Sequence, residues 1–236
     1  MTKEEFLKTI NNRGLVLEKE QIDQLDVYAS FLKEYNEKIN LTAIVDYEEV
    51  LDKHFYDSLL LSFSKEMKGS LVDVGTGAGF PGVVLKICYP KLKVILVEPI
   101  KKRCVFLEEL IEKLQLKDIE VVNQRGEDYS LMHRETYDFV TARAVSNLNM
   151  LIEVCGAMVK KDGYFIALRG LNGQNEIDEA KKAIKTMGFE IEETKEESLF
   201  EGSKRIISYF KKVSATAQKF PRKYSIIKQK PLWVKL

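Results

Sequence analysis

The sequence predicts an α/β protein that has a mostly parallel sheet and a helical region at its N-terminus. Up to about residue 67, apolar residues recur every three or four positions, as they do in helices that bury one face. Beyond that point, short apolar runs alternate with stretches of helical length, which indicates a parallel sheet covered on both faces. With 236 residues, 45% of them hydrophobic, the chain can bury one large core.

Residues 1–67 are predicted to form an N-terminal helical cap. Thr2 with Glu5, and Asp46 with Glu49, have the spacing of residues that cap the first turn of a helix. Between these two starts, apolar side chains follow one helical face at Ile22, Leu25, Tyr28, Leu32, Tyr35 and Ile39.

Residues 68–236 are predicted to form the domain that carries the sheet. Seven strands are expected, at Leu71-Val74, Val94-Val97, Ile119-Val122, Phe139-Thr141, Phe165-Leu168, Phe189-Ile191 and Ile206-Phe210. The first five are far enough apart for crossover helices and should therefore be parallel. Because only a loop separates the last two, they should form an antiparallel hairpin at one sheet edge.

The first strand leads into a glycine-rich turn, in which Asp73-Val74 precedes Gly75, Gly77, Gly79 and Gly82. Glycine allows the backbone to turn sharply and a ligand to approach the main chain closely. The turn therefore predicts a nucleotide-type site. The run from Gly77 to Gly82 also fits the GxGxxG pattern of dinucleotide-binding proteins, so the glycines alone do not identify the cofactor.

Two other residues of this turn favour S-adenosylmethionine over a dinucleotide. The carboxylate of Asp73 would repel a pyrophosphate, whereas it suits the ammonium and sulfonium groups of S-adenosylmethionine. Pro81 removes one of the N–H groups that a phosphate would use at the start of the next helix.

Acidic residues after the second and third strands extend the predicted site. Glu98 is placed to accept hydrogen bonds from ribose hydroxyls, which either cofactor would supply. Gly126 and Glu127 are expected on a loop at the carboxyl edge of the sheet, where an adenine amino group could bind; an ordinary surface loop is the alternative.

The segment after the fourth strand narrows the reaction class. It lacks the (D/N)PP(F/Y) sequence typical of enzymes that methylate exocyclic amines, and no cysteine lies there in a loop suited to attack a pyrimidine carbon. A nitrogen with a free lone pair, such as guanine N7, needs only alignment with the donor. Arg143 is predicted to anchor the cofactor carboxylate or an RNA phosphate, unless it forms an interhelix ion pair.

The positive charge of the chain is concentrated at its C-terminal end. The net charge is only +1, yet from Gly202 to Leu236 there are ten lysines and arginines and no acid. Interspersed aromatic residues suit unpaired RNA bases, so the part from Phe220 to Lys230 is predicted to bind RNA. The aromatic residues of Ile206-Phe210 are instead expected in the core, as part of the final strand. The predicted RNA contacts are Lys102, Arg103, Arg169, Arg222 and Lys223.

The order of these motifs resembles that of the glucose-inhibited division protein B family (GidB, RsmG), the bacterial 16S rRNA guanine-N7 methyltransferases. The matching residues are Asn40-Leu41-Thr42, His54-Phe55-Tyr56-Asp57-Ser58, Asp73 through Gly82, Lys102-Arg103, Arg125-Gly126-Glu127, Arg143-Ala144, Arg169-Gly170 and Phe220-Pro221-Arg222-Lys223. The resemblance implies a Rossmann-like class I methyltransferase fold, S-adenosylmethionine as donor, and a guanine of 16S rRNA or the small ribosomal subunit as acceptor.

The resemblance also implies cofactor contacts at Gly75, Phe80, Gly126, Glu127 and Arg143. The chain departs from the commoner family pattern at Glu98, where many relatives have Asp, and at Arg169, where many have Lys. For His54 and Asp57, a structural pair between cap and sheet and a contact with the substrate both stay open.

Composition also indicates the cellular compartment, the absence of a metal and the alternative functions. Three widely spaced cysteines and the lack of an apolar leader or membrane-spanning stretch suggest a cytoplasmic protein. With two histidines and no metal-binding motif, we expect no metal, and we expect a monomer. Two other functions stay open, an NAD(P)-dependent Rossmann reductase and a non-catalytic RNA-binding scaffold. The reductase lacks a credible Tyr-x-x-x-Lys pair, since Pro90 interrupts the one that starts at Tyr89.

Overall fold

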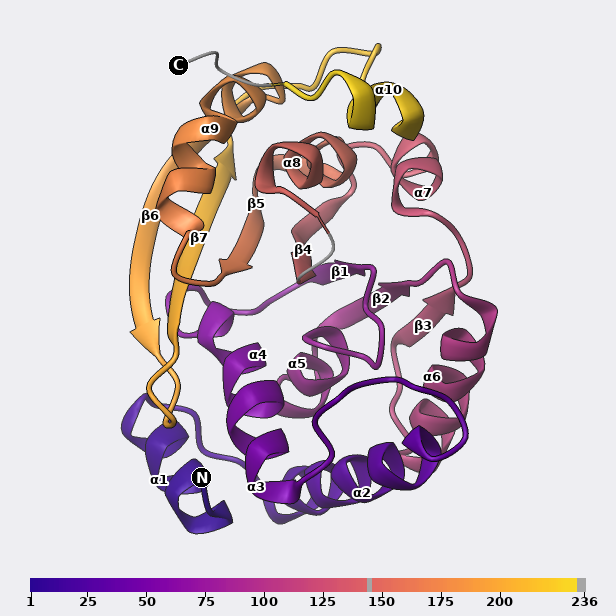
Figure 1. The fold of residues 1–236 in the computed structure, drawn as a ribbon, viewed down its shortest axis with the longest axis vertical. Coiled ribbons are helices and arrows are strands. Elements are labelled where there is room, and N and C mark those ends of the chain that lie inside the picture. The colour runs from indigo at the N-terminus through magenta and orange to yellow at the C-terminus, as the bar shows by residue number, and fades with distance from the viewer. Residues whose placement is uncertain (144–145, 233–236) are drawn as a thin grey trace.

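A seven-stranded sheet runs through the computed structural model, which describes residues 1–143 and 146–232 (Figure 1). The strands are β1 (Ser70–Val74), β2 (Lys93–Val97), β3 (Ile119–Val122), β4 (Tyr137–Arg143), β5 (Val159–Arg169), β6 (Phe189–Ser198) and β7 (Lys204–Lys212). Their order is β3-β2-β1-β4-β5-β7-β6, and only β7 runs antiparallel to its neighbours. This confirms the mostly parallel sheet, its seven strands and the edge hairpin.

The hairpin strands are longer than predicted because their ladder continues through charged residues. The outermost strand of the sheet, β6, carries five glutamates and one lysine. Charge is tolerated there since an edge strand faces solvent, and it discourages pairing with another chain. Apolar runs alone therefore marked only part of each strand.

Helices cover both faces of the sheet. They are α1 (Lys3–Asn12), α2 (Lys19–Asn36), α3 (Tyr47–Val50), η1 (Leu51–Tyr56), α4 (Asp57–Leu59), η2 (Leu60–Ser62), α5 (Gly82–Cys88), α6 (Lys101–Lys113), α7 (Gly126–Met132), α8 (Leu148–Gly156), α9 (Gly173–Thr186) and α10 (Tyr224–Gln229). In Figure 1, α1–α6 lie in the lower part of the view and α7–α10 in the upper part. Alternate residues of each strand serve the two faces: Leu71 joins the core with α5 and α6, whereas Val72 joins the core with α8 and α9. No helix among the described residues is long and apolar enough to cross a membrane.

The N-terminal helices begin where the sequence predicts. Thr2 and Glu5 form the expected capping box, and the Asp46 side chain accepts hydrogen bonds from two backbone N–H groups at the start of α3. However, α2 ends at Asn36, before Ile39. The Asn36 side-chain oxygen accepts hydrogen bonds from the N–H groups of Leu41 and Thr42, which favours a turn over further helix.

The helical stretch from α3 to η2 contains a π-helical turn, η1. Such turns are rare and often occur at functional sites. The buried polar residues of this stretch include Asp52, His54 and Asp57. Asp52 accepts hydrogen bonds from the N–H groups of Phe200 and Glu201, so it holds the turn of the β6–β7 hairpin. His54 and Asp57 face the carboxyl edge of the sheet.

Candidate functional site

The glycine turn after β1 uses its own N–H groups for internal hydrogen bonds. The Gly75 N–H donates to the Val97 carbonyl (2.7 Å). The Gly77 N–H donates to Glu98 Oε2 (3.0 Å), and the Gly82 N–H donates to Asp73 Oδ2 (2.9 Å). A bound pyrophosphate would accept hydrogen bonds from N–H groups of this kind, but those of Gly77 and Gly82 already donate to carboxylates. This geometry disfavours a dinucleotide.

Asp73 lies beneath the turn and braces it. Its side chain is fully buried, and its Oδ2 also accepts a hydrogen bond from the Thr76 hydroxyl (2.6 Å). Among the described residues, its Oδ1 has no hydrogen-bond partner. Burial raises the pKa of Asp73 to about 6, because the charged form loses its hydration. The buried carboxylate thus has unused capacity for a positively charged or hydrogen-donating ligand nearby.

Glu98 combines a structural bond with free acceptor capacity. One oxygen accepts the Gly77 N–H and the other accepts the Ile100 N–H (2.9 Å). A carboxylate has about four acceptor positions, so two remain for hydroxyl groups in the adjoining cleft. The side chain lies at the end of β2, as the sequence predicts.

A cleft runs along the carboxyl ends of β1 and β2. One part, of about 320 Å³, is lined by Gly75, Gly77, Phe80 and Glu98. The other part, of about 150 Å³, is lined by Gly126 and Glu127 together with apolar side chains. Gly75 and Pro99 border both parts, so together they form one elongated site. The cleft therefore has a polar half next to an apolar half, an arrangement that suits a nucleoside with a charged tail.

Gly79 does not line this cleft. Its φ is +100°, and a Cβ there would come within 2.7 Å of the Tyr28 hydroxyl oxygen. The same hydroxyl donates a hydrogen bond to the Ala78 carbonyl (2.6 Å). Gly79 therefore allows α2 to pack against the turn, a role that the sequence pattern did not reveal.

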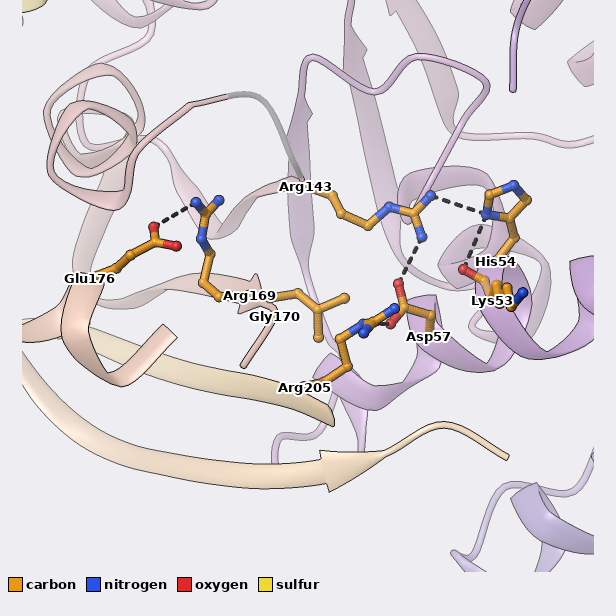
Figure 2. Close-up of a pocket in the computed structure, with 9 residues that line it drawn as sticks. Lys53, His54, Asp57, Arg143, Arg169, Gly170, Glu176 and Arg205 are labelled. Carbon is orange, nitrogen blue, oxygen red and sulfur yellow. Dashed lines mark hydrogen bonds and ion pairs between the residues drawn. The ribbon is translucent and has the colours of Figure 1, made fainter. Parts of the chain in front are cut away.

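A second cavity, of about 380 Å³, adjoins the cleft. Its polar lining consists of Lys53, His54, Asp57, Arg143, Arg169, Glu176 and Arg205 (Figure 2). His54 and Arg143 border both the cleft and this cavity. Four positively charged side chains therefore face two carboxylates next to the predicted cofactor site, which is the charge balance expected for an anionic substrate.

Arg143 lies at the boundary between the two spaces. Its guanidinium donates to Asp57 Oδ2 (3.0 Å), lies 3.4 Å from His54 Nδ1, and is centred 5.1 Å from the middle of the Phe80 ring. Burial and the neighbouring guanidinium lower the pKa of His54 to about 3, so the imidazole is neutral at physiological pH. Arg143 thus makes an ion pair with the helical cap and still reaches both cavities. Ala144, the next residue of this motif, lies outside the described residues.

The chain matches the family described as GidB, rRNA small subunit methyltransferase G, over residues 21–213. It belongs to this family. The ribosomal RNA small subunit methyltransferase G of Bacillus licheniformis is 44% identical to this chain, over 98% of this chain and 99% of its own length. That of Acetivibrio thermocellus is 45% identical, over 93% of this chain and 92% of its own length.

Solved structures agree on the fold. A SAM-dependent methyltransferase from Aquifex aeolicus aligns with a TM-score of 0.54 at 16% identity, covering 75% of this chain and 97% of the other. TYW2 of M. jannaschii, solved in complex with AdoMet, aligns with a TM-score of 0.53 at 15% identity, over 67% of this chain and 75% of its own. The GidB chain thus has the predicted class I methyltransferase fold.

The predicted RNA contacts have different surroundings. Lys102 and Lys223 are exposed, and Arg103 is half-buried with its guanidinium 3.8 Å from Glu98. Arg169 lines the second cavity, where it donates to Glu176 Oε2 (2.6 Å). These four stay predictions.

Arg222, the fifth predicted RNA contact, has a partner inside the protein. Its Nε and one terminal nitrogen donate to the two oxygens of Glu153 (2.7 and 2.6 Å), a fully buried carboxylate on α8. The pair fastens the C-terminal segment to α8. No local pattern indicates this pair, because Glu153 lies 69 positions away in the chain. The RNA contact of Arg222 stays a prediction.

We expect Arg222→Met to lower stability by about 2–3 kcal/mol, since it leaves the buried Glu153 carboxylate unpaired. Lys223→Met is the matched control, because it removes the same charge from an exposed neighbour and should change stability by less than about 0.5 kcal/mol. Urea unfolding monitored by circular dichroism measures both. Equal stability of the two variants would contradict the structural role.

Three lining residues of the second cavity were not singled out from the sequence. Lys53 and Glu176 lie on helices, and Arg205 was counted only as one of many basic residues near the C-terminus. Arg205 lies at the start of a strand predicted for the sheet edge, and nothing in the neighbouring sequence indicates that its side chain faces a cavity. Only the packing of β7 beside β5 brings Arg205 to Asp57.

Proposed function

We propose that this GidB-family protein transfers a methyl group from S-adenosylmethionine to N7 of a guanine in 16S rRNA. The observation that carries the proposal is the cleft at the carboxyl ends of β1 and β2, whose backbone donors are occupied by carboxylates. It adjoins a cavity with excess positive charge. Family membership supports rRNA as the substrate class.

The residues present fit this cofactor. Glu98 would accept the ribose hydroxyls, and the apolar half of the cleft beside Gly126 and Glu127 would hold the adenine. Asp73 braces the glycine turn through Thr76 and Gly82, and its other oxygen, without a partner among the described residues, leaves negative charge beneath the turn. S-adenosylmethionine, when bound, supplies an electrophilic methyl group.

The protein groups would contribute position and electrostatics to the transfer. Guanine N7 has a free in-plane lone pair and loses no proton on methylation, so the site needs no general base. His54, with its low pKa, and Arg143, held by Asp57, are accordingly suited to orient the acceptor nucleotide and not to exchange protons. Alignment alone can contribute about 7–11 kcal/mol to lowering a barrier.

The reductase alternative receives no support from the site. A nicotinamide dinucleotide would place its diphosphate against N–H groups that already donate to Asp73 and Glu98. The scaffold alternative does not require the cofactor cleft that the chain forms. Neither alternative explains both cavities.

Purified protein incubated with methyl-tritiated donor and unmethylated small-subunit rRNA tests the proposal. We expect label on one guanine, and alkaline opening of the imidazole ring of the labelled base to identify N7. Calorimetry should show binding of S-adenosylhomocysteine and none of NADH. Label on an exocyclic amine or a pyrimidine, or binding of NADH alone, would refute the proposed reaction.

A further inference from the structure

Asp57 links two arginines that come from distant parts of the chain. Its Oδ2 accepts a hydrogen bond from Arg143 of β4 (3.0 Å), and its Oδ1 accepts one from Arg205 Nε of β7 (2.6 Å). The carboxylate is 3% exposed, so it has little contact with solvent. Figure 2 shows the two guanidinium groups approaching Asp57 from different sides, at the edge of the second cavity.

The two guanidinium groups keep unused donors. Arg205 also donates one hydrogen bond to the Lys204 carbonyl, and its remaining terminal nitrogen has no acceptor among the described residues. Arg143 uses one N–H on Asp57, and a second nitrogen lies at 3.4 Å from His54. An arginine has five N–H donors in a fixed planar arrangement. Both side chains can therefore bind a further acceptor in the cavity without releasing Asp57.

The charge balance of this cluster selects the acceptor. Two guanidinium groups and one carboxylate leave a single positive charge, because the other two cations of the cavity are already paired, Arg169 with Glu176 and Lys53 with Glu49. An RNA backbone phosphate carries one negative charge and offers oxygens suited to arginine. A phosphate between Arg143 and Arg205 would neutralise the cluster.

We infer that Asp57 is a positioning residue that holds Arg143 and Arg205 as a pair of donors for one backbone phosphate near the acceptor guanine. The inference rests on the proposed function, because it assigns a task within that same reaction. The π-helical turn just before Asp57 sets the position of this carboxylate relative to β4 and β7. His54, on the same turn, packs its ring against Phe80 of the glycine turn and so fixes the cofactor side of Arg143.

Asp57→Asn gives the sharpest test, because the substitution removes a negative charge and so raises the net charge of the protein by one. If the cluster merely attracts RNA, kcat/KM for methyl transfer should stay equal or increase. If Asp57 positions the arginines, kcat/KM should fall about 10- to 100-fold, since an amide nitrogen would face a guanidinium. An unchanged or higher kcat/KM would overturn the inference.

Arg205 variants keep the test decisive if Asp57→Asn does not fold. Arg205→Met should lower kcat/KM about 10- to 100-fold and reduce the slope of log Kd for RNA against log salt by about 0.7, the loss of one phosphate contact. Arg205→Lys should restore the salt slope but not the rate, because an ammonium lacks the fixed fork of donors. Full activity of Arg205→Lys would show that charge alone suffices.

Lys204→Met is the matched control, because Lys204 precedes Arg205 on β7 and pairs only with exposed Glu196. It removes the same charge and should change kcat/KM by less than threefold. Equal losses of kcat/KM in Lys204→Met and Arg205→Met would overturn the inference. A loss of S-adenosylhomocysteine affinity in Arg205→Met would also overturn it, because the arginine would then bind the cofactor. If the wild-type protein transfers no methyl group, the proposed function itself fails.

Discussion

Glu98→Ala is expected to weaken S-adenosylhomocysteine binding at least about 100-fold. Each hydrogen bond to a charged group contributes about 1.5–3 kcal/mol, and the proposed ribose contact involves two hydroxyls. The substitution also leaves the N–H groups of Gly77 and Ile100 without their acceptor, so the glycine turn loses a fixed position. Isothermal titration calorimetry measures the affinity directly.

Glu98→Asp is the matched control. It keeps the charge and is only one methylene shorter, so affinity should fall less than about tenfold. A circular dichroism melt distinguishes a loose turn from an unfolded protein. If Glu98→Ala binds within threefold of wild type, Glu98 does not hold the ribose and its role is confined to the turn.

Lys212→Met is expected to destabilise the protein by about 3 kcal/mol, because it leaves the buried Gly156 carbonyl without a donor and removes one of the two donors to the Met187 carbonyl. The Lys212 ammonium is fully buried and donates to the carbonyls of Gly156 (2.9 Å) and Met187 (2.7 Å) and to the Thr216 hydroxyl. These carbonyls lie at the ends of α8 and α9, where positive charge is favourable. Denaturant unfolding at pH 7 measures the loss.

The pH dependence of stability gives a second measure of Lys212. Burial lowers its pKa from 10.5 to about 8, so between these values the unfolded chain binds more protons than the folded one. Stability contributed by this group therefore rises with pH across that window and is constant below it. Lys212→Met should lack this rise. Lys211→Met, which alters a half-exposed neighbour, should keep it and lose less than about 0.5 kcal/mol.

The fold and the cofactor side of the site could be predicted because their signals are local. The glycine turn, Asp73 and Glu98 lie next to strands that their own apolar residues define, and the carboxyl ends of parallel strands meet at one edge. The helix that ends at Asn36 was overestimated, because a side-chain acceptor competes with helical hydrogen bonding without changing the apolar period.

The substrate side could not be predicted in the same way, because its contacts join distant segments. Asp57 meets Arg205 across 148 positions of the chain, and Arg222 meets Glu153 across 69. Charged residues near a C-terminus look alike in sequence whether they face RNA or a buried carboxylate. The π-helical turn could not be predicted either, since nothing in its composition distinguishes it from an ordinary α-helix.

The contact between Tyr28 and the glycine turn also affects the order in which the chain can assemble. Helix α2 leaves the ribosome early, while the residues that cover its buried face, such as Phe106 and Leu107, are made some eighty positions later. Until then, Phe31 lacks its native partner Phe106 and remains available for wrong associations, whereas Tyr28 can already meet Phe55 and Phe80. Conversely, a fragment that begins at β1 would form the glycine turn without the Tyr28 hydroxyl, which donates to the Ala78 carbonyl.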